Sequence, residues 1–376
     1  MSKNGTATMR WDPYVLAGGT EFDQFWDAHL GSRGREVLFL FGRGFDPRAL
    51  KAIQRLCDLG ASPRIWLLAF DNGLEDSPQR AELTRNNHAS LLKLVTADHI
   101  VQLPVTIGMG QANATSRSTR SAIAKQGQVP SVDDVVVDIS AMPRVVALST
   151  IAKLIYDLDE LAENGHRNVN LHVVAAESVR TDLKATGSLM DEVTNLVGFS
   201  GRLNEETTVH VPRVWYPVLG ERQLERLQLI RDRLNPDEIC PVVPFPSRDP
   251  RRGDRIISEH GDLLFEDFRV EPSNILRASE FNPFEAYRQL FQAMDRYRRA
   301  LTELGGCKAF VSPLSSKLLS VGALLACYDH RFGNIAGRKL NVGIPYVETA
   351  IYADPGIETD VESELYSMWI RGDWEK

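Results

Sequence analysis

Residues 135–155, VVVDISAMPRVVALSTIAKLI, hold the side chains whose types and spacing best suit chemistry. A β-branched run ends at Asp138, Ser140 follows two residues later, and Pro143 and Arg144 precede a run with helical periodicity. This order predicts a strand, a polar loop and a helix start. An acid, a hydroxyl, backbone N–H groups and an arginine then meet where the helix macrodipole favours an anion, and a phosphate fits. The simpler alternative is that the acid and hydroxyl only cap the helix.

A second stretch, residues 308–329, repeats this order of strand, polar loop and helix. In its alignment with the first stretch, a serine matches Ser140 and a lysine takes the place of Arg144 with one residue inserted. The loop SPLSSK resembles phosphate-loop chemistry without the glycine-rich spacing. Its candidate ligand-binding residues are Ser312, Ser315, Ser316 and Lys317.

Two Asp-Pro-Arg loops follow apolar runs, at residues 45–48 and 248–251. Aspartate caps a helix, proline fits the first helical position and arginine projects from the first turn, so capping alone explains the motif. Arginine also binds phosphate bidentately, which makes these loops a candidate anion clamp. The arginines concerned are Arg48, Arg248 and Arg251.

Further polar side chains are expected at the ends of neighbouring strands. Acids at such positions often bind ribose hydroxyls, while capping of the loops is the alternative. The residues are Asp71, Glu280 and Asn282. Aromatic side chains near these loops are candidates to stack on a base or to pack in the core: Phe45, Phe281 and Phe284.

Composition excludes several classes of protein. The chain has 376 residues, 43% of them hydrophobic and 25% charged, which is ordinary for a globular protein of two domains. Its net charge of −7 argues against general binding to duplex DNA or to an anionic membrane. Four scattered cysteines without CxxC spacing indicate neither a zinc site nor a disulfide framework. Without a run of about 18 apolar residues or a signal peptide, the chain is expected to be cytoplasmic.

Apolar runs alternate with helical patterns through the first half of the chain. Strands are expected at residues 36–42, 64–70, 100–105 and 168–178, with a helix at 20–30 before them. Such alternation predicts an α/β fold with mainly parallel sheets, whose ligands bind beyond the carboxyl ends of the strands.

The organisation is expected to be two tandem Rossmann-like lobes, at residues 1–180 and 216–376, joined by a connector at 181–215. In the connector, residues 186–198 are interpreted as the start of a helix and residues 206–218 as an extended strand. Residues 108–131, rich in Gly, Ser, Thr and Gln, are interpreted as a loop with at most one short helix, or as a lid.

Five elements recur in the same order in the two halves. The alignment places the loop at 248–251 opposite that at 45–48, residues 274–284 opposite the strand at 64–70, and residues 341–352 opposite the last strand of the first half. We interpret this recurrence as an internal duplication. The alternative is that two α/β domains share a generic pattern of strands, loops and helices.

The spacing of Asp138, Ser140 and Arg144 resembles the signature of CRISPR-associated Rossmann-fold (CARF) domains. There an acid or amide, a hydroxyl two residues on and a base four beyond close a central strand. The second half matches more loosely, through Ser312 and Lys317, and lacks the acid. The resemblance implies binding of cyclic oligonucleotides across a two-fold interface. The chain carries no recognisable nuclease, protease or HEPN-like element, so the resemblance implies a separate effector protein.

Three functions remain open. The leading hypothesis is a prokaryotic defence sensor that binds a phosphorylated nucleotide between its lobes and signals to a partner effector. The second is an enzyme, a phosphodiesterase such as a ring nuclease or a transferase, acting on a nucleotide or phosphosugar in the same cleft. The third is a scaffold subunit of a defence complex. The chain has no HExxH or GxSxG motif and no metal-ligand spacing, so we assign no catalytic residue, metal or cofactor other than the nucleotide ligand.

Overall fold

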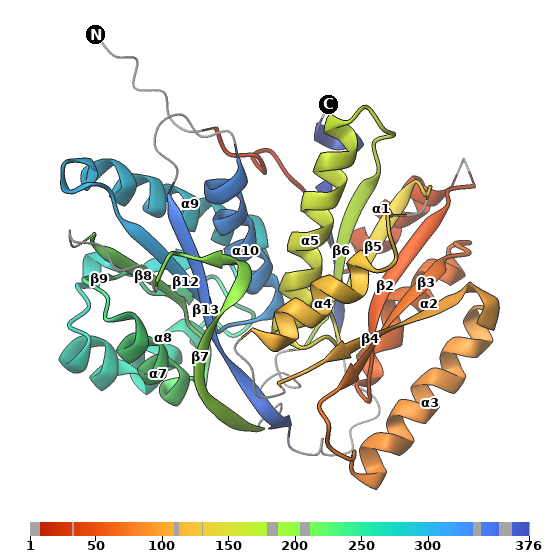
Figure 1. Ribbon diagram of the computed structural model, residues 1–376, viewed down its shortest axis with the longest axis horizontal. Coiled ribbons are helices and arrows are strands. Elements are labelled where there is room, and N and C mark those ends of the chain that lie inside the picture. Colours follow the sequence, from red (N-terminus) through yellow and green to blue (C-terminus); the bar gives the residue numbers. More distant parts are fainter. Residues whose placement is uncertain are drawn as a thin grey trace. The chain divides into compact units, whose positions relative to one another are not determined.

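The computed structural model describes residues 8–31, 34–108, 113–129, 131–178, 187–203, 211–333, 340–352 and 363–375 (Figure 1). The chain forms two compact units. The first lobe comprises Tyr14–Ser188 and Thr349–Lys376, and the second lobe comprises Met1–Pro13 and Leu189–Glu348. Both are mixed α/β units with mostly parallel sheets, as the sequence predicts. None of the described helices is long and apolar enough to cross a membrane.

The first lobe is built on a seven-stranded sheet with the order β1-β14-β6-β5-β2-β3-β4. Its strands are β1 (Val15–Gly18), β2 (Val37–Arg43), β3 (Arg64–Asp71), β4 (Ile100–Thr106), β5 (Asp134–Asp138), β6 (Asn170–Glu177) and β14 (Glu364–Arg371). Strands β2 to β6 pair in parallel, while β14 runs antiparallel to both β1 and β6. The run Leu38–Leu40 in β2 is fully buried, as expected for a central strand covered on both faces.

Helices flank this sheet. They are α1 (Thr20–Leu30), α2 (Lys51–Asp58), α3 (Pro78–Leu94), α4 (Ala114–Ala124) and α5 (Arg144–Glu163), with short 3₁₀ turns η1 (Pro47–Leu50), η2 (Ala97–His99) and η6 (Asp373–Glu375). Helices α4 and α5 lie side by side (Figure 1), and the hydroxyls of Ser116 and Ser149 hydrogen-bond across them at 2.9 Å. Residues 108–131 therefore contain one helix, α4, within the part of that stretch that is described.

The second lobe carries a sheet with the order β11-β10-β8-β12-β13-β7, and β9 pairs with β8. Its strands are β7 (Gly187–Ser200), β8 (Arg213–Val218), β9 (Glu238–Ile239), β10 (Val242–Pro244), β11 (Leu276–Ala278), β12 (Lys308–Pro313) and β13 (Asn341–Tyr352). Its helices are α7 (Leu224–Leu234), α8 (Arg252–Glu259), α9 (Pro283–Ala300) and α10 (Lys317–Phe332), with the π-helical turn η3 (Asp262–Asp267) and the 3₁₀ turns η4 (Pro272–Asn274) and η5 (Thr302–Leu304). The core under these helices includes Trp215, Ile256 and Phe310.

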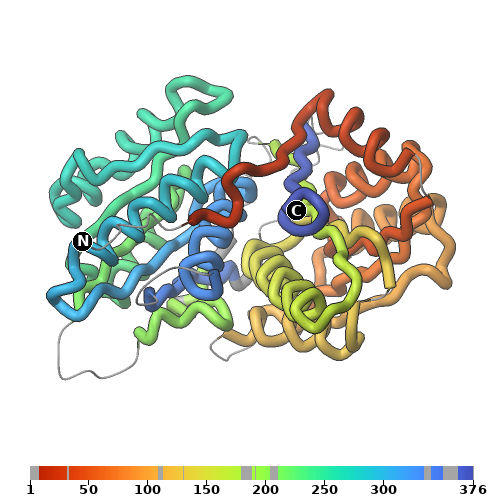
Figure 2. The backbone as a smooth tube through the Cα atoms, turned by 90° about the horizontal axis from the view of Figure 1, so that it is seen from above, coloured from red at the N-terminus to blue at the C-terminus, as the bar shows by residue number. Residues whose placement is uncertain are grey.

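The ends of the chain do not belong to the lobes that the sequence predicts. Trp11 is 1% exposed and packs edge-on against Tyr287 of α9 and Tyr328 of α10 in the second lobe. In Figure 2 the red trace of residues 8–13 lies beside the blue traces of these helices. Conversely, β14 completes the first sheet. The expected boundaries at 180 and 216 are therefore replaced by crossings after Pro13, Ser188 and Glu348.

Two local predictions differ from the structure. The prediction of a helix start at residues 186–198 is wrong, because residues 187–198 belong to β7 at the edge of the second sheet. The extended strand expected at 206–218 is found only as β8, and residues 204–210 lie outside the described part of the chain. By contrast, the helix at 20–30 and the four strands of the first half are confirmed.

The two sheets share a strand order, although the alignment of their loops needs correction. β4-β3-β2-β5-β6 in the first lobe corresponds in order to β11-β10-β8-β12-β13 in the second. In this correspondence β2 matches β8, whereas the sequence alignment matched it to the run at β10. The two Asp-Pro-Arg loops therefore follow non-equivalent strands. Internal duplication itself stays a prediction.

Candidate functional site

Each parallel sheet has one point where the strand order reverses direction. In the first lobe the chain runs outward from β2 to β3 and β4, then returns to add β5 and β6 on the other side of β2. Ligands of doubly wound sheets bind at the carboxyl ends of the strands beside this point. The loops to consider first are therefore those after β2 and β5, and in the second lobe those after β8 and β12.

Hydrogen bonds of its own side chains hold the loop after β5 in place. The Ser140 N–H donates to Asp138 Oδ1 at 2.8 Å, and the Ser140 hydroxyl donates to the same oxygen. The Ala176 N–H of β6 in turn donates to Ser140 Oγ at 2.7 Å. Both side chains are at most 1% exposed, so Asp138 and Ser140 hold the loop to β6 rather than face a ligand.

Arg144 is less buried than Asp138 and Ser140. It is the first residue of α5 and is half-buried. Its N-cap is Pro143, which offers no side chain to close the first backbone N–H groups of this 20-residue helix. A helix start without such a cap, with an arginine in its first turn, has the electrostatics that an anion needs.

Arg48, in the loop after β2, is already engaged. Asp46 caps η1 by accepting from the Arg48 N–H at 2.9 Å, and Pro47 occupies the first helical position, as the motif predicts. The Arg48 guanidinium is ion-paired with Asp46 at 2.8 Å and also donates to the Ala176 carbonyl at 3.5 Å. At 3% exposure it ties β2 to β6, so its assignment to an anion clamp is not supported.

The remaining candidates of the first lobe have local roles. Asp71 is exposed at the end of β3, and its Oδ1 accepts from the Gly73 N–H at 2.8 Å, which is the geometry of a loop cap. Phe45 is half-buried, with the Arg80 guanidinium 4.6 Å above its ring. Neither arrangement has the form expected for a ribose or base contact.

In the second lobe, the loop after β12 resembles that after β5 in position but not in bonding. Ser312 is buried, accepts from Trp215 Nε1 at 3.0 Å and donates to the Pro345 carbonyl at 3.1 Å. Ser316 caps α10 through the Leu319 N–H, and Ser315 is 6% exposed. Lys317, half-buried as the first residue of α10, occupies the place that Arg144 has in the first lobe.

Arg252 connects the loops after β8, β10 and β11 through ion pairs. This 5%-exposed arginine donates twice to Glu221, each time at 2.8 Å, and lies 3.0 Å from Glu280. Burial alone would raise the pKa of Glu221, but the hydrogen bond and charge of Arg252 lower it below its usual value. Glu280 also accepts from the Arg248 N–H at 3.1 Å, so it organises the loop instead of binding sugar.

The other predicted residues of this edge are split between surface and core. The side chains of Arg248 and Arg251 are exposed, and Asn282 caps α9 through the Phe284 N–H at 3.0 Å. Phe284 is 1% exposed and belongs to the core. The structure thus leaves Arg144, Lys317, Arg248 and Arg251 as basic side chains with some access to solvent among the predicted set.

One residue near this site, Arg43, was not predicted from the sequence as a candidate. Arg43 is the last residue of β2, directly at the switch point, and is half-buried. Its Nε is buried and has no hydrogen-bond acceptor among the residues that the structure describes. The signal in the sequence was a single arginine at the end of an otherwise apolar strand, EVLFLFGR.

A histidine cluster lies at the opposite, amino end of β5. The Nε2 atoms of His29 and His172 lie 2.8 and 3.3 Å from Asp134 Oδ1, and these three side chains have the spacing of metal ligands. However, Arg35 already supplies a cation 3.2 Å from the same carboxylate, and Asn170 donates to it at 2.8 Å. A divalent ion would leave the arginine charge uncompensated, so the cluster fits a buried anchor and not a metal site.

The titration of this cluster follows from its burial. Burial would raise the pKa of Asp134, but the hydrogen bonds and charges of His172 and His29 hold it far below its usual range. Burial lowers the pKa of His172 to about 4, against the raising effect of Asp134.

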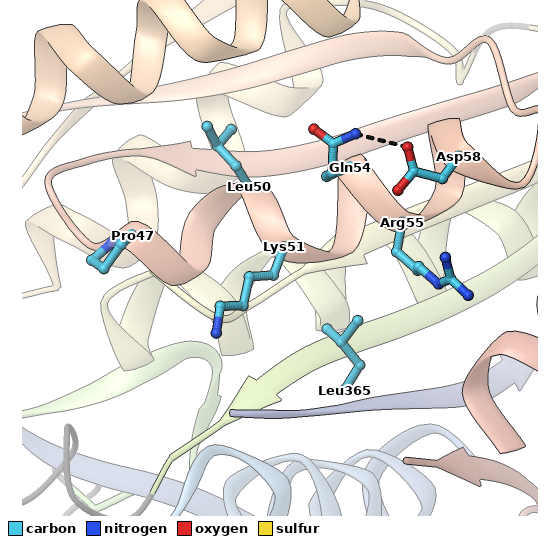
Figure 3. A pocket seen from close by; sticks show the side chains of 7 residues that line it. All are labelled: Pro47, Leu50, Lys51, Gln54, Arg55, Asp58 and Leu365. Carbon is cyan, nitrogen blue, oxygen red and sulfur yellow. Dashed lines mark hydrogen bonds between the residues drawn. The ribbon is translucent and has the colours of Figure 1, made fainter. Parts of the chain in front are cut away.

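A shallow groove lies between α2, η1 and β14 (Figure 3). Its lining residues are Pro47, Leu50, Lys51, Gln54, Arg55, Asp58 and Leu365. Lys51 donates to Ser363 at 2.9 Å, Arg55 pairs with Asp23 at 2.5 Å, and Gln54 donates to Asp58 at 2.8 Å. These polar groups are bonded to one another, to α1 or to the residue before β14, and we assign the groove no ligand.

We compared the chain with protein-family models, curated proteins and solved structures. No protein-family model matches the chain, and no curated protein does. Among solved structures, a putative universal stress protein from Pseudomonas aeruginosa UCBPP-PA14 is similar over 83% of this chain and 92% of that one, with 10% sequence identity and a TM-score of 0.22. A TM-score this low supports no conclusion about function.

Proposed function

We propose that this chain is a sensor that binds a phosphorylated nucleotide at the switch point of its parallel sheets. The observation that carries the proposal is the start of α5: the fourth parallel strand of the first lobe leads through a short loop into a long helix whose first residue is Arg144. Lys317 begins α10 after the corresponding strand of the second lobe. Both positions lie at the edge where doubly wound sheets bind ligands.

The chemistry of this edge suits a phosphate. The first backbone N–H groups of α5 point along the helix axis, its N-cap residue Pro143 gives them no side-chain hydrogen bond, and the macrodipole adds a partial positive charge. Arginine adds a full charge and a planar donor fork that matches phosphate oxygens. Together these groups compensate an anion without any need for a metal ion.

The nature of the nucleotide and the biological setting rest on the resemblance to CARF domains. If the resemblance holds for function, the ligand is a cyclic oligonucleotide, and its binding transmits a signal to a separate effector protein in prokaryotic defence. Asp138 and Ser140 keep the spacing of the motif, and they act here by shaping the loop that precedes Arg144. A sensor is favoured over an enzyme because the acid and the hydroxyl of this motif are bonded to each other, and the hydroxyl also accepts a hydrogen bond from β6.

The first test is native mass spectrometry of the protein purified from its host, followed by denaturation and identification of any released small molecule. Calorimetric titration with ATP and with cyclic tri-, tetra- and hexa-adenylate follows. Arg144→Gln is expected to weaken binding, whereas Lys125→Gln, an exposed lysine beyond the last residue of α4, is expected to bind as the wild type does. Absence of any bound nucleotide in both experiments would refute the proposal, and turnover of the ligand would favour the enzyme.

A further inference from the structure

Trp11 is held on the second lobe by aromatic side chains of two helices. Its indole is 1% exposed and lies edge-on to the rings of Tyr287 in α9 and Tyr328 in α10, at centroid distances of 5.4 and 6.3 Å. The next two residues, Asp12 and Pro13, are exposed. A single large side chain therefore anchors this segment, in the way that a hot-spot residue anchors an interface.

The main chain and the charge of the same segment are recognised as well. The Arg10 N–H donates to Asp329 Oδ2 at 3.0 Å, and the Tyr287 hydroxyl donates to the same oxygen at 2.6 Å. The Asp12 carboxylate pairs with the Arg288 guanidinium at 3.1 Å. We call residues 10–12 the arm, and we call the side chains that hold it the arm site: Tyr287, Arg288, Tyr328 and Asp329.

The arm is an addition to the second lobe and not one of its helices or strands. Its residues lie in a turn and a bend, and only Pro13 and Tyr14 separate it from β1 of the first lobe. Within the arm site, Tyr287 bonds to Asp329 and its ring lies 5.8 Å from that of Phe291, and neither contact involves the arm. The arm site is therefore organised by α9 and α10 themselves, as a binding site for a peptide must be.

A basic face of α9 continues from the arm site. Its members lie on one side of the helix, because they are spaced three or four residues apart: Arg288, Gln292, Arg296 and Arg299. The last three are exposed. Asp295 pairs with Arg299 at 2.6 Å, but this acid is 4% exposed and also binds Arg298. In a chain of net charge −7, such a face attracts an acidic partner.

We propose that the arm site and the basic face together form a docking surface for a protein partner, which binds through an extended segment with a tryptophan followed by acidic residues. The tryptophan takes the place of Trp11, and the acids pair with the arginines of the basic face. In the free chain the arm occupies the site and competes with the partner. This inference goes beyond the proposed function and does not depend on a bound nucleotide.

A partner protein is a better occupant than the arm of a second copy. Because the arm is tethered close to β1, its concentration at its own site is about 1 mM or more. The arm of another copy offers the same contacts, so at micromolar concentration it loses this competition. A segment that adds ion pairs with Arg296 and Arg299 gains affinity that the arm lacks.

The test is fluorescence anisotropy of labelled peptides added to the full chain with Trp11→Ala, in which the arm no longer fills its site. One peptide has the sequence of residues 8–14, a second has residues 8–12 followed by four glutamates, and a third is the first with alanine in place of tryptophan. Burial of a tryptophan favours the docked arm by roughly 10²- to 10³-fold, so with an effective concentration of about 1 mM the first peptide should bind with a Kd of about 1–10 µM. The wild type should bind it about a hundredfold more weakly or worse, because its own arm competes.

The same assay tests the basic face. The glutamate peptide should bind about three- to tenfold more tightly than the first peptide at low salt, which is the effect of two exposed ion pairs. This gain should disappear when the Trp11→Ala chain also carries Arg296→Gln and Arg299→Gln. It should remain in the matched control, which carries Arg277→Gln at an exposed arginine of β11 instead.

Several results would overturn the inference: no binding of either tryptophan peptide to Trp11→Ala, equal binding of the alanine peptide, or a glutamate effect that survives the loss of Arg296 and Arg299. A wild-type dimer in light scattering that dissociates in Trp11→Ala would do the same, since the occupant would then be a second copy. So would single-stranded RNA that binds more tightly than the glutamate peptide and depends on the same two arginines, since the basic face would then serve nucleic acid.

Amide exchange of the wild type gives a second measurement if Trp11→Ala does not fold. An arm that a partner replaces must leave its site while the lobe stays folded. The amides of Arg10 and Trp11 should therefore exchange faster than those in the middle of α9 and α10. Equal protection would show that the arm is part of the core of the lobe, and the inference would be wrong.

Discussion

The stability of the first lobe should fall when the pH is lowered from 8 to 5, because of His172. This side chain is fully buried at the amino end of the sheet, with its ring 4.8 Å from that of Trp26 and 5.0 Å from that of Trp369. Burial lowers its pKa to about 4 in the folded state, against about 6.5 in an unfolded chain.

The sign and size of the effect follow from these two values. Between pH 6.5 and 4 the unfolded chain binds a proton at this site that the folded chain does not, so the free energy of unfolding falls as the pH falls. The contribution is fully present above about pH 7.5, and integration from pH 8 to pH 5 gives a loss of about 2 kcal/mol. The complete loss, reached below pH 4, is roughly 3 kcal/mol.

Urea unfolding at pH 8 and pH 5, followed by tryptophan fluorescence, measures this loss. The quantity to compare is the change in the free energy of unfolding between the two pH values, in the wild type and in His172→Gln, since groups that do not contact His172 contribute equally to both. His166→Gln replaces an exposed histidine of the same lobe and is the matched control, with the pH dependence of the wild type expected. If His172→Gln and the wild type lose the same free energy between the two pH values, the reasoning about this buried imidazole is refuted.

Three further predictions concern packing and buried charge. Arg252→Met leaves the buried Glu280 and the half-buried Glu221 without their cation and should lower the free energy of unfolding of the second lobe by about 3–5 kcal/mol in urea titrations; an unchanged value would show that the carboxylates find other partners. Trp11→Ala should destabilise the same lobe by about 3–5 kcal/mol, seen as faster amide exchange in α9 and α10, and unaltered exchange there would contradict the docking of residues 8–13. Gly42→Ala places a Cβ 2.7 Å from a phenylalanine ring of β3 and should cost about 1–3 kcal/mol, whereas Gly44→Ala meets open space and should be tolerated; equal thermal shifts would contradict this contrast.

The sequence pattern predicted those helices and strands whose conformation depends on nearby residues alone. The apolar run of β2 and the helical spacing of α1 were read correctly, because burial on both faces of a sheet and one-sided burial of a helix leave distinct sequence patterns. The run at 186–198 has apolar residues at helical spacing as well, yet it forms β7. Its structure is decided by pairing with β13, more than 140 residues later in the chain, and a local pattern carries no such information.

The candidate site was predictable in position but not in detail. The switch point and its helix starts follow from the order of strands, and Arg144 and Lys317 stand where they were expected. Whether an arginine is available for a ligand depends on its partners in three dimensions. Arg48 is taken by an aspartate two residues away, while Arg43, which no motif marks, is the one left without a described partner.

The exchange of chain ends between the lobes has a consequence for biosynthesis. β14 lies inside the first sheet, between β1 and β6, but it is synthesised after all the other described strands of both lobes. Until β14 emerges from the ribosome, the first sheet lacks the strand between β1 and β6, while residues Leu189–Glu348 of the second lobe are being made. A premature stop before β14, or a proteolytic cut within it, would therefore damage the lobe most of which is translated first, and each lobe depends on a stretch of chain encoded with the other.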